Sequence, residues 1–427
     1  MIIEAKSRLC RACVFTFQSL LLNLDQTVLL NFLIMKNPKA CYLLLFALLC
    51  CKKPYNPPAT TINANYLVVE GAINTGPDST VIKLSRTVKL SSANVANPEL
   101  HASVMVVSST NATYPLTETG KGYYRAPGLN LSPANTYSLK IITSNGKVYQ
   151  SDFLAEKNSP PIDSVNYKVQ NNQVNINVNA HDPANKTIYY RWDYVETYII
   201  HSYFDTDLKL QTVPFDTVVI ITPPNQIFVC WPSDTSSTVL LGSTAKLRQD
   251  VISQSTIASI PLDSYKFSFR YSILVKQYAL SPEAYNYWRI LKTNTEQLGT
   301  IFDAQPSEPT GNIHCVTTPS EPVIGYLSVG AVSQLRVYIN NGDLPFVKNI
   351  VPLSIDGCLS AQYLFRDSVG FATYVNDVQD FIYTGQQYPI AILPARGGPI
   401  VGYDATDRFC ADCTLRGPNV QPSFWTN

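Results

Sequence analysis

Charge is scarce in this sequence. Lys and Arg number 32 and Asp and Glu 31 among 427 residues, so that charged residues make up only 15% of the chain, against roughly 25% in an average soluble domain. The formal net charge is +1, and a chain with so little net charge has no overall field that would attract nucleic acid. Apolar residues account for 45%. That content is enough for a folded core and excludes a mainly disordered chain.

The usual catalytic and cofactor-binding motifs are also missing. The four His residues are too scattered to form HExxH, and the sequence contains no GxSxG, Walker A or GxGxxG pattern. We therefore expect a non-catalytic protein with no cofactor and no metal. The alternative is an extracellular hydrolase or lyase that acts on glycans. Such an enzyme would need a pair of carboxylates, for which Asp182, Asp193 and Glu196 are candidates.

A short export signal lies near the N-terminus. A basic stretch from Met35 to Lys39 precedes the apolar run Cys41 to Leu49. This run is far shorter than the roughly 20 residues that span a bilayer, but it is typical of a signal peptide. It leads into Cys50-Cys51 and then a Pro-rich stretch, a pattern that resembles a bacterial lipoprotein signal. An ordinary secretory signal and a buried apolar strand are the alternatives. We expect an upstream extension at 1–34, the signal peptide at 35–50, lipid attachment at Cys51 and a tether at 51–62.

Short alternating segments predict a mainly β protein. Seven of them lie between residues 63 and 158, with Gly, Pro and Asn in the turns, which is typical of an immunoglobulin-like sandwich. Pro160-Pro161 marks a boundary, and a larger β-rich C-terminal domain is expected over 159–427. One helix is predicted near 281–298, because Ser281-Pro282-Glu283 is a helix start and an apolar face follows it. A strand is also expected at 324–328.

Five cysteines besides Cys51 follow the signal, and in an exported protein they favour one or two disulfides and at least one free thiol. We expect Cys358 to pair with Cys410 or Cys413, and Cys230 to pair with Cys315. The first bond would hold the irregular C-terminal tail, whose Phe424-Trp425 should be buried. The spacing of Cys410 and Cys413 also suits zinc, if the fold brings them beside His314 and a fourth ligand.

A cluster of aromatic residues follows the predicted boundary. In a strand, Tyr190, Trp192 and Tyr194 lie on one face. Together they could stack on a sugar or peptide ligand. The alternative is that the same face packs in the core of the C-terminal domain.

Several segments are similar to a known family in their order and spacing. They are Tyr66 to Gly71, Ile82 to Thr87, Pro160 to Val165, Tyr271 to Tyr278, Gly311 to Cys315 and Cys410 to Cys413. The chain from about residue 57 to 427 resembles uncharacterised Bacteroidetes lipoproteins that share a domain of unknown function. The resemblance implies an outer-membrane lipoprotein, often encoded beside a TonB-dependent transporter, with an accessory or ligand-capturing role. Lys52-Lys53 stands where surface-exposed members carry acidic residues, so both the surface and the periplasmic face stay open.

Overall fold

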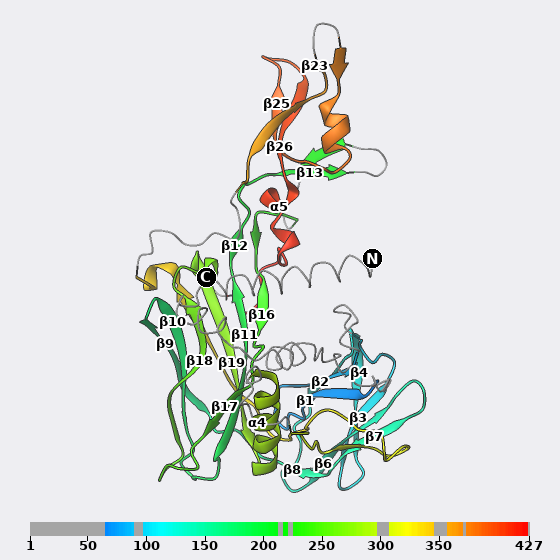
Figure 1. Cartoon of the computed structure of the whole chain (residues 1–427), viewed down its shortest axis with the longest axis vertical. Helices are drawn as coiled ribbons and strands as arrows, with labels where there is room; N and C mark the ends of the chain where they lie inside the picture. Colours follow the sequence, from blue (N-terminus) through cyan, green and yellow to red (C-terminus); the bar gives the residue numbers. More distant parts are fainter. Residues whose placement is uncertain are drawn as a thin grey trace, which may run out of the picture. The chain divides into compact units, whose positions relative to one another are not determined.

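The computed structural model (Figure 1) describes residues 65–425 except 89–96, 212–216, 221–224, 297–306, 346–356 and 370–372. The predicted extension, signal peptide, Cys51 and tether therefore lie outside the described residues. Residues 64–427 form one compact unit. It consists mainly of antiparallel sheets with few helices, and the mainly β prediction is confirmed.

The N-terminal strands, blue and cyan in Figure 1, form a nine-stranded sheet around one core. Its strands are β1 (Leu67–Ala72), β2 (Ser79–Arg86), β3 (Ser103–Ser108), β4 (Thr113–Gly120), β5 (Tyr123–Gly128), β6 (Thr136–Ile142), β7 (Val148–Ser151), β8 (Leu154–Ala155) and β20 (Ile313–Cys315). Every second residue of β2 is buried, as expected for a strand with one face on a core. An Asn145-Gly146 turn joins β6 to β7, and Gly146 has the positive φ that this turn needs.

A segment far downstream completes this N-terminal core. Strand β20 pairs with β7, and the chain then runs beside β1 through isolated parallel bridges at Ile324 and Val329. The strand predicted at 324–328 is therefore wrong, because only single bridges form there. Gly325 has φ +144°, and a Cβ at this residue would lie 2.3 Å from the carbonyl oxygen of Val69. Residues of the region 159–427 thus belong to the core of the N-terminal strands.

Two further sheets face each other across a second core. One contains β9 (Ile162–Gln170), β10 (Gln173–His181) and β18 (Val251–Pro261); the other contains β11 (Tyr189–Tyr198), β16 (Ser233–Thr235), β17 (Leu240–Ser243), β19 (Arg270–Leu280) and β21 (Ser333–Asn340). Short 3-10 turns lie at Tyr265–Phe267 and Asn341–Asp343. Helix α4 (Pro282–Glu296) follows β19 as predicted, and the Ser281 hydroxyl caps it by accepting from the Ala284 N–H. Residues 297 and 298 of the predicted helix lie outside the described chain.

Residues inserted into this second region, together with the C-terminal tail, form what we call the C-terminal lobe. Its elements are β12 (Ile200–His201), β13 (Leu208–Gln211), β14 (Thr217–Ile220), β15 (Val229–Cys230), β22 (Ser360–Leu364), β23 (Asp367–Val369), β24 (Thr373–Val375), the π-helix η3 (Val378–Ile382), β25 (Tyr388–Pro394), β26 (Ile400–Thr406), α5 (Arg408–Ala411) and the 3-10 turn η4 (Cys413–Leu415). Strands β22, β26 and β25 form its sheet. Leu208, Val378, Ile382 and Tyr403 form its small core.

The disulfides hold the tail to this lobe, as expected, but one pairing differs from the prediction. Cys358 bonds to Cys410, one of its two expected partners. Cys230 bonds to Cys413, and Cys315 is a buried free thiol. The predicted pairing of Cys230 with Cys315 is wrong because Cys315 lies on β20 in the N-terminal core, whereas Cys230 ends β15 beside the tail. The tail is also buried at its end, where Trp425 packs edge-on against Tyr338.

Candidate functional site

The aromatic face proposed for ligand stacking is not free to bind a ligand. Tyr190 and Trp192 are fully buried in the core between the two facing sheets, and Tyr194 packs against the same core. The Tyr190 hydroxyl donates to Asp250 at 2.9 Å, and the Trp192 indole N–H donates to Gln277 at 2.9 Å. The alternation of β11 turns these side chains inward. They are core residues, and the stacking prediction is wrong.

The carboxylates proposed for a hydrolase also have structural partners. Asp182 accepts three backbone N–H bonds within its own turn, and these bonds lower its pKa against the opposing effect of burial. Asp193 pairs with Arg191 at 2.9 Å. Glu196 is buried and bonded to Lys266 and the Tyr271 hydroxyl. These bonds neutralise the charge of each carboxylate or satisfy its hydrogen-bonding capacity. None of the three carboxylates lines any of the pockets described below.

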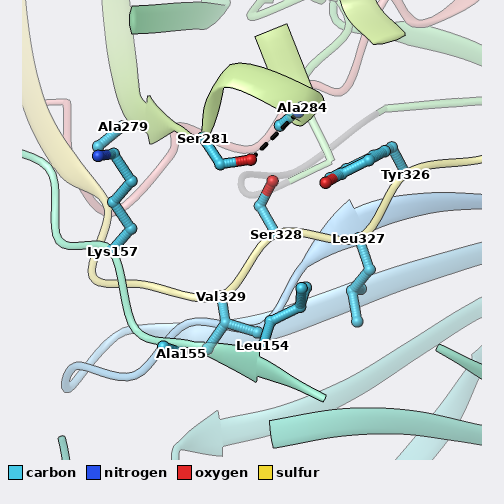
Figure 2. A pocket seen from close by; sticks show the side chains of 10 residues that line it. All are labelled: Leu154, Ala155, Lys157, Ala279, Ser281, Ala284, Tyr326, Leu327, Ser328 and Val329. Atoms are coloured by element: carbon cyan, nitrogen blue, oxygen red, sulfur yellow. Dashed lines mark hydrogen bonds between the residues drawn. The ribbon is translucent and has the colours of Figure 1, made fainter. Parts of the chain in front are cut away.

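One pocket lies where helix α4 meets the N-terminal strands (Figure 2). The hydroxyl groups of Ser281, Tyr326 and Ser328 point toward one another, while Leu154 and Val329 form its opposite wall. Its volume is about 50 Å³, enough for a few water molecules but far below the roughly 300–1,000 Å³ of small-molecule sites. This pocket is therefore a packing gap between the two regions. Another pocket, of about 560 Å³, is lined entirely by residues of one continuous segment, 308–323, which includes strand β20.

The pocket in the C-terminal lobe is built differently, because five separate segments meet there. It has a volume of about 310 Å³, within the range of small-molecule sites. Its lining residues are Lys209, Leu210, Asn225, Ile227, Gly385, Gln387, Tyr388, Arg408, Asp412, Thr414 and Asn419. We call it the lobe pocket. A cavity formed by several distant segments and carrying many polar groups is the strongest candidate for a site in the described chain.

Asp412 organises one wall of the lobe pocket. Its carboxylate accepts from Arg408 Nε and Nη2 at 3.0 and 2.9 Å, and from the Thr414 N–H at 2.9 Å. The same residue ends α5 and begins η4. Cys410 and Cys413, on either side of it, each form a disulfide, Cys410 with Cys358 and Cys413 with Cys230. The wall is therefore held both by hydrogen bonds to a buried carboxylate and by two covalent links.

Other polar groups of the lobe pocket have no protein partner in the described part of the chain. Tyr388 is only 8% exposed, yet its hydroxyl makes no hydrogen bond to another described residue. Burial, reinforced by the charge of Asp412, raises the pKa of Tyr388 to about 12, so its hydroxyl is neutral and can donate. The ammonium of Lys209 and the side-chain amides of Asn225 and Gln387 are likewise unpaired. These groups can bind a polar ligand.

The chemistry of the lobe pocket favours binding over catalysis. Asp412 is the only carboxylate among its described lining residues, and both of its oxygens already accept hydrogen bonds. A glycosidase needs two carboxylates facing the bond that it cleaves. Cys410 and Cys413 are in disulfides, so neither offers a thiolate for zinc. In the described ranges, no group of three or more His, Cys, Asp or Glu residues could hold a metal ion.

Sequence reasoning did not identify the lobe pocket. Its residues lie up to 210 positions apart, and no local pattern connects Lys209 with Tyr388 or Asn419. The only signal was Asp412, a carboxylate between two cysteines that were expected to form disulfides. Within the described segments, no helix is both long and apolar enough to cross a membrane.

Comparison with known proteins gives one family. The model of a family described as "Domain of unknown function (DUF4249)" matches residues 52–336. The match includes the N-terminal strands and the facing sheets as far as β21, together with the part of the lobe near Lys209. No curated protein matches the chain.

Proposed function

We propose that this chain, which belongs to the DUF4249 family, is a lipoprotein of a Bacteroidetes outer membrane and a non-catalytic binding or docking accessory of a TonB-dependent transporter. The sequence at 35–51 supports the anchor, since an apolar run of signal-peptide length ends at Cys51. The resemblance described above supports the transporter as partner.

The β25–β26 hairpin is the observation that carries the docking role. Near its turn, Ile392 is 40%, Ile400 44% and Val401 37% exposed. Ile392 is paired with Tyr403, and Val401 is the extra residue of a β-bulge between the pairs Leu393–Gly402 and Pro394–Ile400. The end of the hairpin therefore exposes three apolar side chains close to one another. Exposed apolar clusters of this kind mark protein interaction sites.

The hydrolase alternative has less support. An enzyme should bring titratable groups together in one cleft. Here Asp182, Asp193 and Glu196 are bonded to separate structural partners. No observation on the described residues favours the alternative, and we do not propose it.

Membrane fractionation tests the anchor. We expect Cys51→Ser to move the protein from the membrane fraction to the soluble fraction, because the modified Cys would carry several acyl chains and a single chain gives only marginal binding. Cys50→Ser is the matched control and should stay with the membrane. The reverse pattern would show that the acylated residue was wrongly chosen, and retention of both variants would contradict a lipid anchor at this site.

Affinity purification tests the partner. The tagged chain is isolated from outer membranes and its associated proteins are identified by mass spectrometry. We expect a TonB-dependent transporter to copurify with the unmodified chain and to be lost with Ile400→Asp, which places a charge in the apolar hairpin. Val169→Asp is the matched control, because Val169 lies on strand β9 with a similar exposure of 38%. Copurification that is unchanged by Ile400→Asp would refute docking through the hairpin.

A further inference from the structure

We propose that the lobe pocket binds an acidic monosaccharide unit, that is, a polyhydroxylated ring carrying a carboxylate. This inference specifies the ligand class for the binding role proposed above and rests on it. It is argued from the groups that line the pocket and from their unused hydrogen-bonding capacity.

The hydrogen-bonding groups of the lobe pocket suit a ligand with several hydroxyls. Tyr388 as a whole is largely buried, and its hydroxyl lines the pocket without a protein partner among the described residues. The unpaired amides of Asn225 and Gln387 each offer both a donor and an acceptor. A sugar hydroxyl also donates and accepts, so that it can satisfy a phenol and an amide at the same time. A purely apolar ligand would cover the Tyr388 hydroxyl without replacing its hydrogen bonds to water, which is unfavourable.

The charges of the lobe pocket add a preference for an anion. Lys209 and Arg408 are cationic, and Asp412 is the single anionic residue in the lining, so the net charge of the lining is +1. The Asp412 side chain is 3% exposed, whereas that of Arg408 is 57% exposed. A ligand therefore meets the cations first. The carboxylate of an acidic sugar would pair with the free ammonium of Lys209 and with the exposed side of the Arg408 guanidinium.

The size and the apolar part of the pocket limit the ligand further. A volume of about 310 Å³ is at the lower end of the range for small-molecule sites, which favours one sugar unit over an extended oligosaccharide. Leu210 and Ile227 supply an apolar surface, against which the C–H face of a sugar ring can pack. The disulfides beside Asp412 fix one wall before the ligand arrives, and this reduces the ordering cost of binding.

Calorimetry on the full chain, purified in detergent without any transporter, tests this inference separately from the docking role. The probes are D-glucuronate and D-galacturonate, with D-glucose and D-galactose as neutral counterparts. We expect a uronate to bind and its neutral counterpart to bind at least about tenfold more weakly, because a charge-assisted hydrogen bond is lost. Lys209→Gln and Tyr388→Phe should each weaken uronate binding by about tenfold. Lys168→Gln, an exposed lysine on β9, is the matched control and should bind normally.

The thermal transition of each variant is measured first, to show that the variant is folded. If Lys209→Gln perturbs the fold, Tyr388→Phe still tests the pocket, because it removes only the hydroxyl and keeps the buried ring. Absence of uronate binding, equal binding of uronate and neutral sugar, or uronate binding unchanged in both pocket variants would each overturn the proposal. An additional measurement with polygalacturonate separates the two sources of the ligand. Binding of the polymer that depends on Lys209 shows that the unit is taken from a glycan, whereas binding of the monomer alone shows that it is taken as a free acid. Copurification of a transporter has no effect on either result.

Discussion

The N-terminal strands should not form a stable domain without the segment that returns to them from residues 309–331. This segment adds strand β20 to the edge of β7 and places four side chains in the N-terminal core. Ile313 is 3%, Cys315 2%, Leu327 1% and Val329 4% exposed. The prediction is that a fragment of residues 64–158, although it contains β1 to β8, does not fold cooperatively by itself.

The magnitude follows from the buried side chains. Burying a Val, Leu or Ile side chain contributes about 1.5–3 kcal/mol, so the three aliphatic residues together contribute about 5–9 kcal/mol, an upper value because the unfolded chain already buries some surface. Asn312 adds two hydrogen bonds to the backbone of Leu327, at 2.8 and 3.0 Å. The sum is comparable with the entire stability of a small domain, about 5–15 kcal/mol.

Urea unfolding followed by near-ultraviolet circular dichroism is the assay. The fragment 64–158 should show no cooperative transition, and addition of a peptide of residues 309–332 should restore one. A peptide carrying Leu327→Asp and Val329→Asp is the control and should have no effect. A fragment that unfolds cooperatively without the peptide would refute the reasoning.

Two further predictions concern the covalent and ionic links. Replacing both Cys230 and Cys413 by Ala should destabilise the lobe by up to about 5 kcal/mol in the chain-entropy model, because the bond closes a sequence separation of 183 residues. Non-reducing peptide mapping of the native protein should find this pair. A peptide that links Cys230 to Cys315 would contradict the pairing. Burial alone would raise the pKa of Glu321, but hydrogen bonds from Lys147 and Tyr149 and the charge of Lys147 hold that pKa below its usual range. The stabilisation by ionised Glu321 is therefore present above the unfolded pKa, about 4.3, and is lost as the pH falls through the lower folded value. Urea unfolding should show that Glu321→Gln lowers the free energy of unfolding by about 2 kcal/mol at pH 7 and by much less at pH 3. An equal loss at both pH values would contradict a stabilising role of the ionised carboxylate.

Local patterns predicted local structure well. Alternating segments between residues 63 and 158 indicated strands such as β2, and the Ser281-Pro282-Glu283 sequence correctly placed the start of α4. These features depend on a residue and its near neighbours along the chain, which is why a single sequence contains them.

Features that depend on distant segments could not be predicted in the same way. Cys315 was paired with Cys230 in the prediction because the sequence does not show that β20 joins β7. Alternation along the strand indicated that Tyr190 and Trp192 share one face. It does not show whether solvent or a second sheet covers that face. The lobe pocket likewise exists only because insertions near Lys209 and Tyr388 meet the disulfide-bonded tail.

The central claim, that this protein docks on an outer-membrane transporter through the apolar β25–β26 hairpin, is tested most directly by site-specific photocrosslinking in intact cells. A photoreactive amino acid is placed at Ile400 in one strain and at Val169, the matched exposed position on β9, in another. The account predicts a crosslink from position 400, but not from position 169, to a TonB-dependent transporter. No transporter adduct from position 400, or the same adduct from both positions, would contradict it.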